Sequence, residues 1–356
     1  MKRSVFLSLV GVTVIALALA LFLSEPRTAA DGDAQAQALV PGLKAEVNDI
    51  EALEIAIEAD RSIRLQRSED RWRVENADGY EADFELVYQL LRDLAAGQRA
   101  EPRTSNPEWH DRLGVAAAGA GESDADRSVE VAFPETALPA LIVGRPGPAG
   151  ESRFVRLAAD DQVWLSDRDI DIPTDIVEWL QRSIMDIPAS ELEEITLRHA
   201  DGDIAQLQAA DESGSQWVLM NVPDGREAAP AWQLSSVANA LTSLRLDDVR
   251  RHTASPEDAS AALYVTRDGL NFVATLFKDA AGSWVNFSVS AELGAAAEGE
   301  ELSDEAASAS ADAAAVDARL SPWDFKLPEA KYEQMTRRLE DLLAAVEDDP
   351  SEASDS

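Results

Sequence analysis

The sequence contains no cysteine among its 356 residues. This absence excludes catalysis by a thiol, disulfide bonds, cysteine-ligated zinc and a lipid-modified N-terminal cysteine. It is consistent with a location outside the cytoplasm but does not establish one.

Basic residues are also scarce, with 31 Lys and Arg against 67 Asp and Glu, so the formal net charge is −36. Binding to nucleic acid or to an anionic lipid surface needs clustered Lys and Arg, and the composition argues against both classes of function. We interpret the acidity first as a means of keeping the protein soluble.

Familiar catalytic motifs are missing as well. The chain has no Gly-x-Ser-x-Gly elbow, no Ser-x-x-Lys pair and no phosphate-binding glycine loop. The three histidines, His110, His199 and His252, show no spacing typical of a zinc site. Carboxylates are too abundant to nominate a glycosidase pair. We therefore assign no catalytic, cofactor-binding or metal-ligating residue, expect no cofactor, and interpret the protein as a non-enzyme.

The N-terminal region contains a long uncharged stretch. Lys2 and Arg3 precede Ser4 to Leu23, which is rich in Val, Leu, Ile and Ala. A helix of this length spans about 30 Å, roughly one hydrocarbon core. The stretch predicts a transmembrane anchor, with residues 1–30 forming the anchor and its flank; the alternative is a signal peptide cleaved after Ala30.

Charges on either side of this stretch predict its orientation. Basic residues precede it, and Glu25 and Asp31 follow it. By the positive-inside rule, the N-terminus is expected in the cytoplasm and the bulk of the chain in the periplasm. The predicted location is the cell inner membrane, with a single pass.

The first half beyond the anchor predicts strands followed by a helix. Apolar residues alternate with polar ones around Leu53 to Ile57, Ile63 to Leu65 and Trp72 to Val74. Asp83 can cap a helix with one apolar stripe that ends at Gly97. A last helix is predicted from Asp171 in "DIPTDIVEWLQRSI".

The second half repeats this order. Strands are predicted around Ile195, Ile204 and Trp217, then a helix with apolar positions from Leu234 to Leu244, and a final helix from Lys326 in "KLPEAKYEQMTRRLEDLL". We read two copies of one unit. The predicted fold class is α+β: two tandem copies of a mainly antiparallel strand-helix-strand-helix unit after an N-terminal transmembrane helix.

The predicted boundaries are residues 43–188 for the first unit and 189–346 for the second. Residues 116–127, 291–318 and 347–356 are rich in Ala, Ser, Gly and acid. Such segments bury too little apolar surface to offset the entropy of ordering, so we predict that they are mobile, with 291–318 a disordered acidic insert and 347–356 a disordered tail.

The stretch "TSNPEWHDRLGV", residues 104–115, gathers Trp109, His110, Asp111 and Arg112. The matching stretch of the second half, "TASPEDASAALYV" from Thr253, keeps the polar cap, the proline and the acid but not Trp-His-Asp-Arg. What recurs is the signature of a helix start. We favour that structural interpretation; the alternative is a site kept by one half only.

Several of these features together resemble a known family. The N-terminal anchor, "PGL", the strand-Trp-strand start, "GYEAD" and "EPRTSNPEWHDRLGV" are similar to the uncharacterised bacterial domain-of-unknown-function family 4340. The second half shows looser echoes in "TASPED" and "WDFKLP". The long acidic insert and the heavy negative charge depart from the family pattern.

The resemblance implies a membrane-anchored periplasmic protein associated with gliding-motility-type ABC transporters and their auxiliary protein. It supplies no catalytic residues. Our leading hypothesis is a non-enzymatic accessory subunit of an ABC-type transport complex, whose partners are the transporter's membrane components or the auxiliary protein, with the membrane itself contacted through the N-terminal helix.

Two alternatives remain open at this point. One is an extracytoplasmic binding module for an envelope glycan or another cell-envelope ligand, suggested by tryptophans in the strand patterns: Trp72, Trp164, Trp217 and Trp284. The other is an envelope hydrolase centred on His110, Asp111 and Arg112, which requires that these side chains converge in a pocket.

Overall fold

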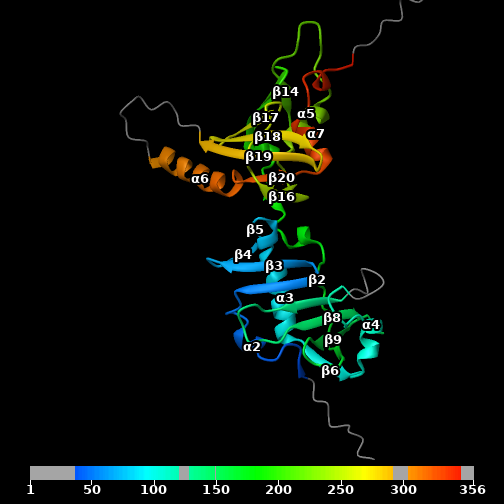
Figure 1. Ribbon diagram of the computed structural model, residues 1–356. Coiled ribbons are helices and arrows are strands. Elements are labelled where there is room, and N and C mark those ends of the chain that lie inside the picture. Colours follow the sequence, from blue (N-terminus) through cyan, green and yellow to red (C-terminus); the bar gives the residue numbers. More distant parts are fainter. Residues whose placement is uncertain (1–36, 120–127, 149, 292–303, 346–356) are drawn as a thin grey trace, which may run out of the picture. The chain divides into compact units, whose positions relative to one another are not determined.

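The computed structural model of the protein describes residues 37–119, 128–148, 150–291 and 304–345 (Figure 1). The predicted anchor, Ser4 to Leu23, and the predicted acidic tail lie outside these residues.

The predicted single-pass location needs correction. Among the residues that the structure describes, no helix combines the length and the apolar character needed to cross a bilayer. The predicted single-pass inner-membrane location is therefore not seen in the described residues, and the stretch that predicted it, Ser4 to Leu23, lies outside them.

The described chain is built mainly of antiparallel strands, in sheets of ten, eight and two strands. The ten-stranded sheet has the order β1 (Gln37–Ala38), β6 (Gln98–Pro102), β10 (Trp164–Ser166), β9 (Arg153–Leu157), β8 (Leu141–Pro146), β7 (Val129–Ala132), β2 (Ala52–Glu58), β3 (Arg61–Ser68), β4 (Arg71–Val74) and β5 (Tyr80–Glu81).

The eight-stranded sheet has the order β14 (Trp217–Leu219), β13 (Ile204–Ala209), β12 (Leu192–Arg198), β17 (Ser260–Thr266), β18 (Leu270–Asp279), β19 (Gly282–Ala291), β20 (Trp323–Lys326) and β16 (Asp248–Arg251). The two-stranded sheet pairs β11 (Ser183–Met185) with β15 (Leu244–Arg245).

Helices are few and mostly short. They are α2 (Leu43–Glu46), α3 (Phe84–Ala96), α4 (His110–Leu113), α5 (Ala231–Ala238), α6 (Asp304–Leu320) and α7 (Glu329–Met335), with 3-10 turns η1 (Glu75–Ala77), η2 (Pro107–Trp109), η4 (Ile176–Trp179), η5 (Ala189–Glu191) and η6 (Glu340–Leu342). The predicted α+β strand-helix-strand-helix class is therefore wrong: sheets dominate, and an N-terminal helix is not among the described elements.

The helix predicted from Asp171 shows why the class was wrong. Only the single turn η4 forms there, and the chain then enters β11. The backbone N–H of Gln181 donates to Glu81, and Trp179 accepts from the N–H of Asp83. These long-range hydrogen bonds take backbone groups that a continuing helix would use internally. The predicted final helix likewise divides into α7 and η6.

The predicted mobile insert, 291–318, is partly wrong as well. The strand β19 extends to Ala291, and α6 covers residues 304–320; residues 292–303 lie outside the described residues. Alanine has the highest helix propensity, and Ala313 and Leu320 are buried. The Asp317 carboxylate accepts hydrogen bonds from the Val289 N–H and the Ser321 hydroxyl, which attaches α6 to β19.

The helix α3 follows its sequence signals closely. The Asp83 side chain accepts a hydrogen bond from the Leu86 N–H, as predicted for a cap. The helix ends at Ala96, immediately before Gly97, whose missing side chain leaves room for Leu39.

Contacts between Cα atoms divide the chain into two units. Unit 1 comprises Met1–Ser62 and Leu90–Ile172, and unit 2 comprises Ile63–Gln89 and Pro173–Ser356. This division follows contacts, whereas the predicted boundaries 43–188 and 189–346 concern duplicated sequence. Those boundaries stay a prediction.

The two larger sheets share a strand order. The ten-stranded sheet contains the run β4-β3-β2-β7-β8-β9-β10-β6, and the eight-stranded sheet runs β14-β13-β12-β17-β18-β19-β20-β16. If the eight strands of each run are numbered from first to last along the chain, the two runs have the same order of numbers. The strands β5 and β1 are additions at the two edges of the larger sheet, so matched strands can be compared position by position.

The core of unit 2 lies along the strands of the eight-stranded sheet. Buried residues largely alternate along β12, β17 and β18, as a sheet with one face on a core requires, whereas β19 is buried on both faces from Ser283 to Phe287. The largest fully buried side chains there are Tyr264, Phe287 and Phe325. In unit 1, Val115, Ile142 and Val163 form a buried apolar cluster.

Gly214 occupies a position that tolerates no side chain. Its φ is +63°, and a Cβ there would lie 2.3 Å from the backbone oxygen of Ala189. Gly225 has a similar φ of +80°, but no atom lies within 4 Å of the place that a Cβ would take.

We expect Gly214→Ala to destabilise the protein by about 2–5 kcal/mol, because left-handed strain of about 1–2 kcal/mol adds to overlap of about 1–3 kcal/mol. Gly225→Ala carries the strain alone and is the matched control. Urea unfolding measures both, and equal losses would contradict the predicted overlap with Ala189.

Candidate functional site

The stretch around Pro107 is a helix start, as the structural interpretation predicted. The Asn106 side chain accepts a hydrogen bond from the Glu108 N–H, and Pro107 takes the first position of η2. The short helix α4 follows and ends at Gly114, whose φ is +65°. The matching residues after Ser255 form only a turn, closed by the Ala259 N–H and the Pro256 carbonyl.

The residues proposed for a hydrolase do not converge. His110 is buried, and its Nε2 lies 3.0 Å from the carbonyl oxygen of Asp161, to which it donates. Asp111 is exposed, and the Arg112 guanidinium lies 4.7 Å from the centre of the Trp109 ring. The three side chains have three separate environments, so the geometric condition for the hydrolase hypothesis is not met.

The other two histidines have their own polar partners. The His199 Nδ1 lies 3.0 Å from the Ser260 hydroxyl oxygen, and its Nε2 donates to the Arg337 carbonyl. His252 contacts Asp324. Among the described residues, no group of three or more His, Cys, Asp or Glu side chains could hold a metal ion.

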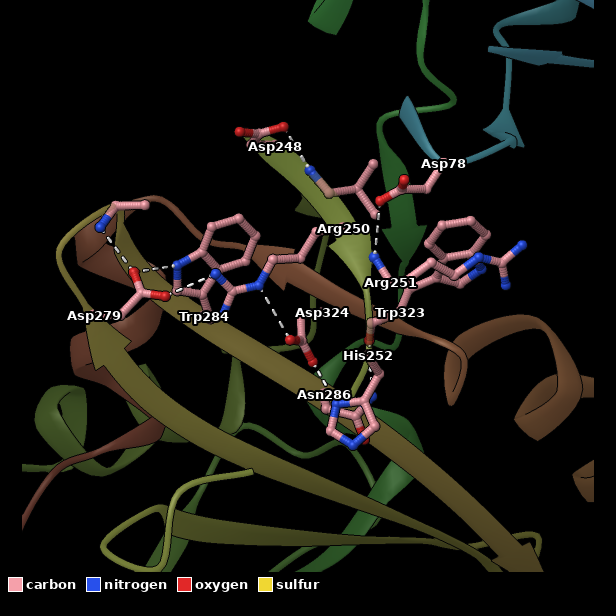
Figure 2. Close-up of polar contacts among 12 residues, drawn as sticks. Asp78, Asp248, Arg250, Arg251, His252, Asp279, Trp284, Asn286, Trp323 and Asp324 are labelled. Atoms are coloured by element: carbon pink, nitrogen blue, oxygen red, sulfur yellow. Dashed lines mark hydrogen bonds and ion pairs between the residues drawn. The ribbon is translucent and has the colours of Figure 1, made fainter. Parts of the chain in front are cut away.

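A cluster of charged and aromatic side chains in unit 2 is built on two paired strands. In the antiparallel pair β16–β20, Arg250 lies opposite Asp324, and Arg251 lies opposite Trp323. Because directly opposite residues share a face and successive residues alternate, the two arginines point to opposite faces of the sheet. Figure 2 shows both groups.

Asp324 lies at the centre of the first group and is only 2% exposed. It accepts a hydrogen bond from the Arg250 Nε at 3.2 Å and contacts the His252 Nδ1 at 2.6 Å (Figure 2). The neighbouring Asn286 amide donates to the Ser321 and Trp323 carbonyls and fixes the turn before β20. A buried carboxylate needs such partners, because desolvation without them is costly.

Arg250 joins this group to a second carboxylate. Its guanidinium donates to Asp279 at 2.7 Å and lies 4.0 Å from the centre of the Trp284 ring. Burial lowers the pKa of Arg250, but the hydrogen bonds to Asp279 and Asp324 raise it more. The hydrogen bond from Arg250, with others from Ala281 and Trp284, lowers the pKa of Asp279 to about 2.

An Asp–His pair is also a component of hydrolytic triads, which require a nucleophile within hydrogen-bond reach of the histidine. Among the described residues, no Ser, Thr or Lys side chain is hydrogen-bonded to the His252 ring; its backbone N–H donates to the Pro322 carbonyl. The cluster therefore links strands β16, β18, β19 and β20, and its geometry is that of a stabilising charge network.

On the opposite face of the pair, Trp323 forms part of a cavity wall. The Arg251 guanidinium lies 3.9 Å from the centre of its ring, and the Tyr80 ring meets it edge-on at 5.0 Å. The cavity, of about 260 Å³, is lined by both rings and by Arg71, Arg73 and Arg319. No local sequence pattern indicates this cavity, because its residues come from three distant segments of the chain.

Unit 2 also exposes large apolar side chains. Val218 is 48% exposed on β14, Met220 follows that strand at 56%, and Trp232 is 69% exposed on α5. The helix α5 packs against β14 (Figure 1). We call these three residues the β14–α5 surface. The stretch "QWVLM" could have indicated this surface from the sequence. Val218 lies between Trp217 and Leu219, which are buried, so in a strand it points to the opposite side.

The tryptophans that suggested glycan stacking are in the core: Trp72, Trp164, Trp217 and Trp284 are all buried. The glycan hypothesis thereby loses the observation that motivated it.

Comparison with known proteins identifies a family. The model of a family described as Domain of unknown function (DUF4340) matches residues 72–263, more than half of the chain. No curated protein and no solved structure matches.

Removal of the Asp324 carboxylate tests the charge network. Asp324→Ala leaves Arg250 and His252 without their shared partner, and we expect a loss of about 2–3 kcal/mol in urea unfolding. This is less than the ~3–5 kcal/mol of a fully buried pair, because the Arg250 side chain is 37% exposed. Asp258→Ala, at an exposed carboxylate, is the control. If Asp324→Ala lost no more stability than Asp258→Ala, the network would be contradicted.

Acid titration tests Asp279. Its folded pKa of about 2 lies below the ordinary 3.8, so its contribution to stability is present above about pH 4 and disappears as the pH falls through 2. We expect the stability difference between the wild type and Asp279→Asn to shrink from pH 5 to pH 2. Urea midpoints across this range measure it; a difference independent of pH would show that the carboxylate charge contributes nothing.

Proposed function

Since the chain belongs to the family described as Domain of unknown function (DUF4340), we propose that it is a non-enzymatic accessory protein that acts by binding another protein, a component of an ABC-type transport complex. The resemblance noted in the sequence supplies the partner class. The β14–α5 surface is the observation that supports protein binding.

Exposed apolar side chains are common when they occur singly. Val218, Met220 and Trp232 instead lie on two elements that pack together. Trp and Met are enriched at protein interfaces, and anchoring side chains of this kind carry most of the binding free energy. Burial of each by a partner contributes about 1.5–3 kcal/mol.

Comparison of the matched strands shows that the fold itself does not require apolar residues there. Trp217 of β14 corresponds to Trp72 of β4, so Val218 stands where β4 has Arg73, and Met220 stands where the first copy has Glu75. Charged residues thus serve at the equivalent positions of the other sheet. In this chain 28% of the residues are charged. Exposed apolar side chains at Val218 and Met220 therefore favour a partner that covers them.

The position of β14 supports the same function. It is the terminal strand of the eight-stranded sheet, and Val218 and Met220, two residues apart, lie on the same side of an extended chain. A partner can therefore contact both of these side chains from one side of the strand. An edge strand also offers backbone groups for pairing with an extended segment of another protein.

We expect the double variant Met220→Lys, Trp232→Lys to lose the partner, because each anchor contributes about 2 kcal/mol or more and each 1.4 kcal/mol is a tenfold change in affinity. The measurement is a pull-down of the tagged full chain from detergent-solubilised membranes, with quantitative recovery of ABC transport components. Recovery is expected to fall at least tenfold.

Trp109→Lys, at an exposed tryptophan outside the β14–α5 surface, is the matched control and should leave recovery unchanged. Thermal melting checks that each variant folds. Absence of every transport component from the wild-type pull-down would count against the proposed partner class, and undiminished recovery with the double variant would count against the surface.

A further inference from the structure

A cavity in unit 2 concentrates positive charge in a strongly acidic chain. It has a volume of about 260 Å³, and its lining includes Arg71, Arg73 and Arg319. We call it the arginine cavity. The chain as a whole carries a formal charge of −36, so three guanidinium groups around one small space stand out from their surroundings.

Two of the arginines come from one strand. Arg71 and Arg73 are two residues apart on β4 and share its outward face, whereas Trp72 and Val74 between and after them are buried. The third arginine, Arg319, comes from the last turn of α6 and donates from Nη1 to the Ile184 carbonyl at 2.9 Å. Local strand geometry and the docking of a helix thus combine to build the cavity.

The positive charge of the cavity is only partly compensated. Glu81 is the one carboxylate among the lining residues, and its distance from the Arg71 guanidinium is 3.8 Å, too long for a hydrogen bond. Among the described residues, the Arg73 guanidinium makes one hydrogen bond, to the Gly79 carbonyl. Since a guanidinium carries five N–H donors, the arginines retain donors for a ligand.

The walls shape the space for a small group. The buried Tyr80 and Trp323 rings meet edge-on, and the Tyr80 hydroxyl donates to the Gln181 carbonyl, which fixes its ring. On the α6 side, Ala315 and Ala318 lie on the same helical face as Arg319 and present only methyl groups. The volume lies just below the ~300–1,000 Å³ of drug-sized pockets.

The matched strand of the second sheet shows that the fold does not demand these arginines. Gln216 and Val218 of the second copy stand where the first has Arg71 and Arg73. Both sheets keep the buried tryptophan between these positions. The arginines are therefore specific to the first copy, as expected for residues that serve a ligand.

We propose that the arginine cavity binds a small oxyanion, a carboxylate or phosphoryl group, through the guanidinium groups of Arg71, Arg73 and Arg319. The planar fork of arginine matches both groups with paired hydrogen bonds. The residues of this site are distinct from the β14–α5 surface, so the inference stands apart from the proposed function.

The test is titration calorimetry on the full chain with two probes, inorganic phosphate and succinate, at constant ionic strength set with chloride. We expect saturable binding of at least one probe, and the probe that binds identifies the ligand as a phosphoryl or a carboxylate compound. The double variant Arg73→Gln, Arg319→Gln should bind at least tenfold more weakly, since it loses two charge-assisted contacts.

Arg245→Gln is the matched control, because Arg245 is an exposed strand arginine of the same unit outside the cavity. Thermal melting supplies a second measurement: the bound probe should raise the Tm of the wild type and of Arg245→Gln, but not that of the double variant. Absence of saturable binding for both probes, or equal weakening in Arg245→Gln, would overturn the proposal.

Discussion

The pairing of β16 with β20 is the constraint on which the polar architecture of unit 2 depends. Its register places Arg250 opposite Asp324 and Arg251 opposite Trp323. Because side chains alternate along a strand, this one register determines both faces at once. A shift by one residue that placed Val249 opposite Asp324 would move Arg250 to the other face and would leave the buried carboxylate without its guanidinium partner. The buried charge network and the tryptophan of the arginine cavity are consequences of the same pairing.

The two larger sheets share a strand order but carry different side chains on their matched strands. Both keep a buried tryptophan, Trp72 in β4 and Trp217 in β14. Beside it, the first sheet presents Arg71 and Arg73, and the second presents Gln216 and Val218. A duplicated scaffold allows this divergence, because the buried alternation maintains the sheet while the outward positions are free to acquire separate roles. The arginine cavity and the β14–α5 surface are the two outcomes in this protein.

The acidity of the chain gives these two surfaces their contrast. Composition alone assigns no individual role to the 67 Asp and Glu residues. Their net charge affects solubility more directly than it affects the fold. On such an acidic surface, a cluster of guanidinium groups or of exposed apolar side chains indicates a binding site. The contrast is a property of the folded surface, since the residues of each cluster are separated in sequence.

The sequence by itself determined the local features: the strands around Trp72 and Trp217, the Asp83 cap of α3, the helix start at Asn106 and Pro107, and the family. These depend on neighbouring residues, through alternation, capping and fixed φ angles. Only the tertiary structure decided that the chain after Asp171 forms a turn and a strand, that α6 forms within the acidic insert, and that Arg71, Arg73 and Arg319 meet. In each case the outcome depends on hydrogen bonds and packing between residues far apart in the chain, and local periodicity carries no record of those partners.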